Sequence, residues 1–383
     1  MYRVALVASH VIQYQAPFFR LLAAHPDIDL TVLFCARDGA EVYRDTEMQT
    51  TLRWDLDLLS GYHSEFLRNF GSGEGYSRRI NPSIVTKLAF GRYDAVIFFL
   101  GWGTISSLLG MAACRMSGTP ILMFGDSSFL PPPRLARDAM MRAIVGSTDA
   151  FLVSGKLNGD YYRHYGAEER RFFLVPWAID NDRFIHASRF APGERSALRA
   201  RFSIRDDQML IVFAAKLLPR KDPMTLLRAV DAMQHRDRTA VLFLGDGELR
   251  EPLERFARER NLAAHFAGFI NQTDLPKHYA MADVFVLPSL DDPRATVVNE
   301  AMACGLPIVI TDRCGPVGDI VRHGDNGFIF SAGDVGTLAS ELDTLAGTPE
   351  LRTRMSERSR EIISTWDYTR GVEGVVEALR STC

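Results

Sequence analysis

Short apolar runs that alternate with helical patterns are the feature of this sequence that most restricts its fold. The first half contains RVALVAS, LTVLFC, DAVIFFL, PILMFG, AFLVSG and FFLVPWA, and the second half contains MLIVFAAK, TAVLFLG, HFAGF, VFVLPS, PIVIT and GFIF. Nearly unbroken apolar strands, each followed by a helix, indicate parallel strands that are covered on both faces. Two such series in succession predict two doubly wound α/β domains.

A polar stretch, PWAIDNDRFIHASRFAPGERSALRARF, separates the two series. We place the boundary near Phe184, which gives an N-terminal domain over residues 1–184 and a C-terminal domain over residues 185–365. A length of 383 residues agrees with two domains, because a single core of that size is unusual.

Composition excludes several classes of protein. The chain is 47% hydrophobic and 24% charged, with a net charge of −3 and a pI of about 6.3, so it lacks the basic field that a nucleic-acid partner requires. Its five cysteines are scattered without metal-binding spacing, which indicates buried thiols in a reducing compartment. The apolar run at the N-terminus is too short to span a bilayer and lacks a signal-peptide cleavage pattern, so we expect a cytoplasmic protein.

Basic and glycine residues follow the first strands of the second series. Lys216, Arg220 and Lys221 share one loop that leads into a helix, an arrangement that favours an anion site, although a solvated basic turn explains them as well. Gly245 and Gly247 follow the next strand. They lack the third glycine of a dinucleotide motif and are interpreted as a tight turn.

The stretch DDPRATVVNEAMACGLP contains a carboxylate where a packed helix gains nothing from one. A helix is expected to begin near Ala295 and to end before Gly305. Glu300 lies about a turn and a half into this helix, among small apolar residues. We interpret its partner as a ligand rather than a side chain. The helix amides would bind phosphate, and Glu300 would bind the hydroxyls of a ribose. Asp292 would bind a sugar that lies beyond the phosphates.

These residues resemble a motif of the retaining glycosyltransferases of family 4, in which two acidic residues are separated by seven others. FAAKLLPRKDPMTLLRAV, LGDGELREPLERFARERN, FAGFINQTDLPKHYAMADVFVLPS and GPVGDIVRHGDNGFIF follow the same order as in that family. The resemblance is strong over residues 200–335 and weak in the N-terminal half. It implies the GT-B architecture, in which two Rossmann-like domains face a central crevice and a last helix, here residues 366–383, packs back on the N-terminal domain.

The resemblance also implies roles for individual residues. Lys216 and Lys221 would stabilise the donor diphosphate, and Asp292 would hold the transferred sugar; these three, with Asp126, are the candidate catalytic residues. The remaining donor-binding candidates are Phe269, Ile270 and Asn271 at the base, Ala295, Thr296 and Val297 near sugar and phosphate, and Glu300 at the ribose.

The chain departs from the family pattern at several positions. Ala295 replaces a usual glycine, and its Cβ narrows the sugar pocket. Gly125-Asp126 stands where the family has a histidine on an N-terminal loop, and a turn or helix cap explains Asp126 equally well. The candidates in the first N-terminal loop are His10, Gln13 and Tyr14, where the family often has two glycines.

The expected activity is that of a hexosyltransferase, which transfers a sugar without a metal ion or a cofactor. The donor would be a nucleoside-diphosphate sugar, with UDP favoured over GDP. The acceptor would be a saccharide or glycolipid in a surface-polysaccharide or glycolipid pathway, or else a small molecule. The motif DND at Asp180 to Asp182 imitates a metal site but is interpreted as a turn.

Two other functions stay open. One is a different GT-B sugar-nucleotide enzyme, such as an epimerase or a phosphorylase. The other is a non-catalytic sugar-binding protein. The Gly-rich basic stretch FLRNFGSGEGYSRRINPS predicts an acceptor gate, a peripheral contact with the inner face of a membrane, or a solvated loop.

Overall fold

The computed structural model describes residues 1–45, 47, 50–71 and 79–383. The central part of the Gly-rich basic stretch, residues 72–78, lies outside this range. The chain forms two compact units. Unit 1 comprises Met1–Tyr43, Leu56–Ala178 and Asp367–Cys383, and unit 2 comprises Arg44–Asp55 and Ile179–Trp366.

Unit 1 contains a parallel sheet of seven strands among its described residues. The order is β5 (His63–Phe66), β2 (Ile28–Phe34), β1 (Tyr2–Ala8), β6 (Ala95–Phe98), β7 (Ile121–Phe124), β8 (Ala150–Val153) and β9 (Phe172–Leu174). The helices of this unit are α1 (Ala16–Ala24), α2 (Ser83–Phe90), α3 (Ile105–Ser117), α4 (Leu135–Gly146), α5 (Lys156–His164) and α14 (Tyr368–Thr382).

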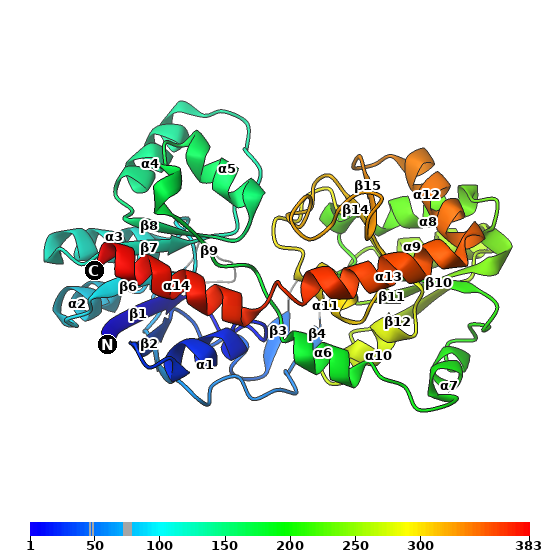
Figure 1. The fold of residues 1–383 in the computed structure, drawn as a ribbon, viewed down its shortest axis with the longest axis horizontal. Coiled ribbons are helices and arrows are strands. Elements are labelled where there is room, and N and C mark those ends of the chain that lie inside the picture. The colour runs from blue at the N-terminus through cyan, green and yellow to red at the C-terminus, as the bar shows by residue number, and fades with distance from the viewer. Residues whose placement is uncertain (46, 48–49, 72–78) are drawn as a thin grey trace. The chain divides into compact units, whose positions relative to one another are not determined.

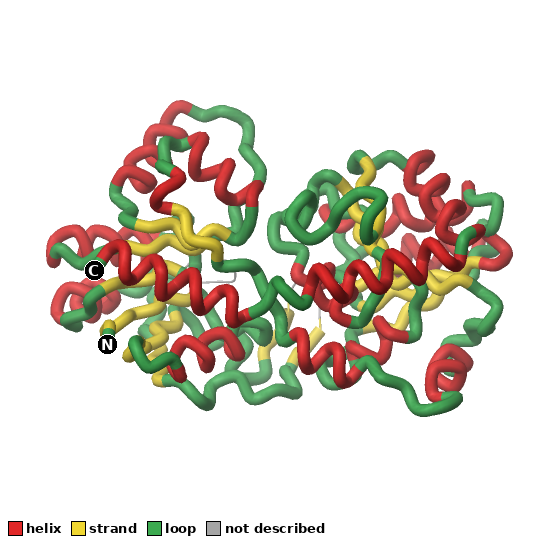
Figure 2. The backbone as a smooth tube through the Cα atoms, in the orientation of Figure 1, coloured by secondary structure: helices red, strands yellow, loops and turns green. Residues whose placement is uncertain are grey.

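Unit 2 contains a parallel sheet of six strands in the order β12 (Ala264–Gly268), β11 (Thr239–Leu244), β10 (Met209–Ala214), β13 (Val284–Leu287), β14 (Ile308–Thr311) and β15 (Gly327–Phe330). Every residue of β10 and β11 is buried, because helices cover both faces, as Figure 2 shows. The helices are α6 (Asn181–Ala187), α7 (Glu194–Ala200), α8 (Pro223–Ala232), α9 (Arg250–Glu259), α10 (Leu275–Ala280), α11 (Thr296–Ala303), α12 (Val335–Gly347) and α13 (Pro349–Ile363).

The twelve apolar runs identified in the sequence all form strands of these two sheets, so the prediction of two doubly wound α/β domains is confirmed. Helix α14, red in Figure 1, packs on α1 and β9 of unit 1. There the Tyr368 hydroxyl donates to the carbonyl oxygen of Tyr14 at 2.6 Å.

The division between the units differs from the expected one in two respects. It falls between Ala178 and Ile179 rather than near Phe184. Phe184 lies inside unit 2, where its 1% exposed ring packs at 6.4 Å from the ring of Tyr279. In addition, Arg44–Asp55 belongs to unit 2 although it comes from the N-terminal sequence, and it contains β4 (Thr50–Leu52) and most of β3 (Tyr43–Asp45).

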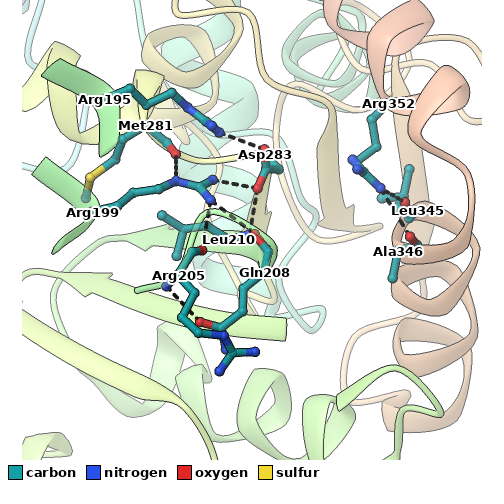
Figure 3. Close-up of polar contacts among 10 residues, drawn as sticks. All are labelled: Arg195, Arg199, Arg205, Gln208, Leu210, Met281, Asp283, Leu345, Ala346 and Arg352. Atoms are coloured by element: carbon teal, nitrogen blue, oxygen red, sulfur yellow. Dashed lines mark hydrogen bonds and ion pairs between the residues drawn. The ribbon is translucent and has the colours of Figure 1, made fainter. Parts of the chain in front are cut away.

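An ion pair between a buried arginine and a partly exposed aspartate fixes the amino-terminal edge of the unit 2 sheet (Figure 3). Arg199 of α7 is 1% exposed and donates to Asp283, just before β13, at 2.7 Å. Its other guanidinium nitrogens donate to the carbonyl oxygens of Met281 and Gln208 at 2.9 and 3.1 Å. Asp283 also accepts from the amide of Leu210 in β10 at 2.7 Å. The pair thus ties α7 to two neighbouring strands.

Four of the five cysteines are buried, as expected, but Cys383 is exposed. Burial raises the pKa of the Cys35 and Cys114 thiols to about 12, which keeps them protonated and unreactive. Within the described ranges, we find no helix that is both long and apolar enough to cross a bilayer.

Candidate functional site

The order of strands in unit 2 reverses between β10 and β13. In doubly wound sheets, ligands bind at such a point, beyond the carboxyl ends of the two strands. The loop after β10 contains Lys216 and Lys221, and the loop after β13 contains Asp292. Three of the residues singled out from the sequence therefore lie where the topology predicts a ligand.

Lys221 and Asp292 form a buried ion pair across this point. The Lys221 ammonium donates to one oxygen of the Asp292 carboxylate, and each residue is 8% exposed. The other oxygen of Asp292 accepts from the amide of Ala295 at 3.1 Å. The sequence predicted separate roles for these two residues, and the structure brings them into direct contact.

The loop that contains Asp292 is held by backbone contacts. The Asp292 amide donates to the carbonyl oxygen of Arg313 at 3.0 Å, and its own carbonyl oxygen accepts from Gly315 at 2.9 Å. A Cβ atom on Gly315 would lie 1.9 Å from the carbonyl oxygen of Pro293, so this approach requires glycine. The carboxylate is therefore presented from a rigid loop.

Helix α11 begins directly after Ala295, as expected. Ala295 has φ 41° and ψ 44°, in the left-handed region that favours glycine, so the methyl group of this alanine strains the backbone. The amides of Thr296 and Val297 lie in the first turn, where no preceding helical turn supplies an acceptor. These amides and the helix dipole favour a negative charge at this end of α11.

Glu300 is 5% exposed, and the expectation that its partner is a ligand rather than a side chain is wrong for one of its oxygens. The Tyr279 hydroxyl, on α10, donates to Oε2 of Glu300 at 2.8 Å. Burial raises the pKa of the Glu300 carboxyl to about 7, and the Tyr279 hydrogen bond and the charge of Arg183 oppose this rise. Tyr279 is fully buried, and its role as the partner of Glu300 was not predicted from the sequence.

Lys216 contacts the acidic side chains of Arg44–Asp55. Its ammonium donates to both carboxylate oxygens of Asp45 at 3.0 and 2.8 Å and to Glu47 at 2.6 Å. The sequence offered no signal for these contacts, because 171 positions separate Asp45 from Lys216 and the stretch around Asp45 has no apolar period. Arg220 also lies near Glu47, at 3.6 Å.

The loop that bears Lys216 packs closely on the turn after β11. A Cβ on Gly245 would lie 2.1 Å from the carbonyl oxygen of Ala215, and Gly245 has φ 137°. Only glycine permits this approach. The interpretation of the two glycines as a tight turn is thus confirmed.

Phe269, Ile270 and Asn271 follow β12 and are half-buried. The ring of Phe269 meets that of Trp54 edge to face at 6.0 Å, and the Asn271 amide group donates to the carbonyl oxygen of Arg53 at 2.8 Å. This turn is therefore in contact with the same segment as Lys216.

The weaker candidates lie in unit 1. His10 follows β1, and its Nδ1 is 2.9 Å from the hydroxyl of Ser9. Gln13 and Tyr14 lie in the turn before α1, where the Tyr14 ring meets Trp177 edge to face at 5.9 Å. Asp126 follows β7, and its carbonyl oxygen accepts from Ser128 at 3.3 Å. Their roles stay predictions.

Asp180 caps helix α6 by accepting from the amide of Arg183 at 3.0 Å, which agrees with the structural interpretation of the DND motif. Among the residues that the structure describes, no three His, Cys, Asp or Glu side chains gather as a metal ion would require.

Comparisons with known proteins show which families and structures the chain is similar to. Residues 194–362 match the family model of the Glycosyl transferases group 1. The GDP-mannose-dependent alpha-(1-6)-phosphatidylinositol monomannoside mannosyltransferase of Mycolicibacterium smegmatis is 28% identical over 309 residues, which cover 76% of this chain and 78% of that protein. The sulfoquinovosyl transferase SQD2 of Arabidopsis thaliana is 31% identical over 307 residues, which cover 76% of this chain and 57% of that protein.

A solved structure, that of Anabaena HepE in complex with UDP, superposes with a TM-score of 0.76 over the full length of both chains. At 17% identity this likeness concerns the fold, which is the GT-B architecture of two Rossmann-like units. The family match covers most of unit 2, which contains the strand ends described above. Residues 194–362 of the chain thus belong to the group 1 glycosyl transferases.

Proposed function

We propose that this protein transfers a sugar from a nucleoside-diphosphate donor to a saccharide, glycolipid or small-molecule acceptor, with retention at the anomeric carbon. The observation that best supports this proposal is the buried pair of Lys221 and Asp292 at the start of α11, with the buried carboxyl of Glu300 in the same helix. A cation, first-turn amides and two carboxyl groups at a topological switch point suit a diphosphate that links a ribose to a sugar.

Each group would have a separate task. Lys216, Lys221 and the first-turn amides of α11 would stabilise the charge that develops on the leaving diphosphate. Glu300 would accept hydrogen bonds from the ribose hydroxyls, and Asp292 would orient the transferred sugar. The phosphate oxygen of the donor would take the proton of the acceptor hydroxyl. This scheme needs neither a basic side chain nor a metal ion nor another cofactor.

The acceptor would bind unit 1, which contains His10, Gln13, Tyr14 and Asp126. The name of the mycobacterial relative, which includes a phosphatidylinositol monomannoside, supports a lipid-linked or saccharide acceptor. The exposed Leu130 and Leu135, with Leu135 at the start of α4, support a peripheral contact with the cytoplasmic face of a membrane.

A thermal-shift panel tests the donor class. The panel contains UDP, GDP, glucose and mannose, because the sequence favours UDP whereas the mycobacterial relative is named for GDP-mannose. We expect one nucleoside diphosphate to raise the melting temperature, since a ligand at 100 times its Kd stabilises by about 2.7 kcal/mol. A response to free sugars alone would instead indicate a sugar-binding protein.

Metal independence is tested separately. Transfer from the nucleotide sugar that the panel identifies should continue in excess EDTA. A loss of activity that Mg²⁺ or Mn²⁺ restores would contradict the metal-free scheme and would require a search for metal ligands.

A further inference from the structure

The described residues of the segment Arg44–Asp55, here called the arm, contact two parts of the candidate donor site in unit 2. At one end, Asp45 and Glu47 pair with Lys216, at 2.8 Å and 2.6 Å for the shortest contacts. The Asp45 side chain is 11% exposed and that of Lys216 is 30% exposed, so this contact is largely shielded from water. The ammonium group expected to bind the donor diphosphate is thus surrounded by carboxylates of the arm.

At its other end the arm contacts the turn expected to bind the base. Trp54 meets Phe269, and the carbonyl oxygen of Arg53 accepts from Asn271. The amide of Thr273 donates to the carboxylate of Asp55 at 3.1 Å. The arm therefore lies against both the diphosphate end and the base end of the site. The carboxylates of Asp45 and Glu47 are anionic like a diphosphate, and the ring of Trp54 is a flat aromatic group like a nucleobase. The arm thus offers the site groups similar to those of a nucleoside diphosphate.

We propose that Asp45 and Glu47 set the affinity for the donor by competing with its diphosphate for Lys216. Carboxylate and phosphate oxygens bind an ammonium group in the same way, so both cannot hold Lys216 fully at one time. If Lys216 is held by the arm for most of the time, the measured affinity for the diphosphate falls by the fraction of molecules in which Lys216 is available. The inference rests on the proposed function, since it requires a diphosphate at Lys216.

Calorimetry with UDP and GDP tests the inference on the full chain. The double variant Asp45→Asn/Glu47→Gln keeps the shape of both side chains but removes their charges. We expect its Kd for the bound nucleotide to fall about fivefold, since an ion pair of this exposure shifts an equilibrium by up to about that factor. The single variant Glu47→Gln changes a side chain that is 47% exposed, and its Kd should fall by only about twofold.

A matched control separates local competition from net charge. Asp207→Asn/Asp237→Asn also removes two negative charges from unit 2, and these side chains are 67% and 97% exposed. They precede β10 and β11, at the opposite edge of the sheet from Lys216. The control should change the Kd by less than about twofold, because exposed charges at that distance are screened.

Lys216→Ala provides a second check. In that background the two arm substitutions should no longer tighten binding, because their effect requires the ammonium group. Unchanged or weaker nucleotide binding by Asp45→Asn/Glu47→Gln in the otherwise native chain would overturn the inference while leaving the proposed function intact. If neither the native chain nor the variant binds UDP or GDP, the proposed function fails as well.

Discussion

The two edges of the unit 2 sheet both contain buried charges, but they satisfy them in different ways. At the amino-terminal edge, the guanidinium of Arg199 is bonded to Asp283 and to three backbone carbonyl oxygens, and Asp283 accepts from a strand amide. At the carboxyl-terminal edge, the Lys221 ammonium pairs with the Asp292 side chain, and Lys216 pairs with side chains of the arm.

This difference in bonding partners indicates a different role for the charged residues at each edge. A charge that is bonded to backbone atoms of several elements serves those elements, because a ligand cannot replace its partners without unfolding them. A charge that is paired with a side chain can exchange that partner for a ligand of similar chemistry. We therefore assign the first edge to stability and the second to binding, and the following predictions test that assignment.

The largest effect is expected at the amino-terminal edge. Arg199→Ala leaves the carboxylate of Asp283 without its buried partner and should lower the free energy of unfolding by about 3–5 kcal/mol, as measured by urea denaturation. Arg195→Ala removes a 39% exposed partner of the same carboxylate and should cost less than about 1 kcal/mol. A nucleotide Kd that changes in folded Arg199→Ala protein would contradict the purely structural assignment.

At the carboxyl-terminal edge, Asp292→Asn should act on turnover. We expect kcat to fall about 100-fold, because the proposed role of the carboxylate is to orient the reacting sugar. Affinity for the bare nucleoside diphosphate should not fall, since that ligand lacks the sugar and Lys221 is released from its partner. Steady-state kinetics and calorimetry measure the two effects, with the exposed neighbour Asp291→Asn as the control. Equal losses of turnover in both variants would refute the role of Asp292.

Glu300→Gln should instead weaken binding of the donor and of the bare nucleoside diphosphate alike. A lost charged hydrogen bond to the ribose costs about 1–3 kcal/mol, and calorimetry with either ligand measures it. The glutamine oxygen still accepts from Tyr279, so the local packing is preserved. If this variant binds the diphosphate normally, Glu300 belongs with Arg199 among the structural charges.

The pH dependence of stability provides an independent measure of Glu300. Its pKa is raised from 4.5 in the unfolded chain to about 7 in the folded protein, so the folded state binds the additional proton between these values. Its contribution is present at low pH and is lost as the pH rises from about 4.5 to about 7. Urea denaturation should show this loss in the native chain relative to Glu300→Gln. Parallel profiles would indicate an unperturbed carboxyl.

The smallest effect concerns the backbone at the start of α11. Ala295→Gly relieves the left-handed strain of Ala295 and should raise stability by about 0.5–1 kcal/mol, measured as an increase in melting temperature. The control Ala301→Gly, in the interior of the same helix, should lower stability by a similar amount. A decrease in both variants would show that Ala295 is not strained.

The strands could be predicted from the sequence because an apolar run buried on both faces is a local signal. Strand β5, His63–Phe66, was missed because its sequence HSEF is polar and no residue of it is fully buried. The residues at the ends of β10 and β13 could be located by topology and by their resemblance to the family.

Partners that come from distant parts of the chain could not be predicted. The sequence around Tyr279 is that of an ordinary core residue and does not indicate its hydrogen bond to Glu300. Nothing near Asp45 indicates that it pairs with Lys216. The roles assigned to the site residues stay predictions, because contacts within the protein describe what each side chain meets and not what it does for a ligand.

The position of helix α14 in the chain has a consequence for how unit 1 folds during synthesis. It follows the whole of unit 2 in the chain, yet it completes unit 1, where Gly374 lies so close to the carbonyl oxygen of Leu174 that a Cβ would be 2.1 Å away. On the ribosome, the apolar surface of α1 and β9 is therefore without its cover until unit 2 has been synthesised. Unit 1 begins to form before unit 2 is made and is completed after it, and until then its exposed apolar surface favours aggregation.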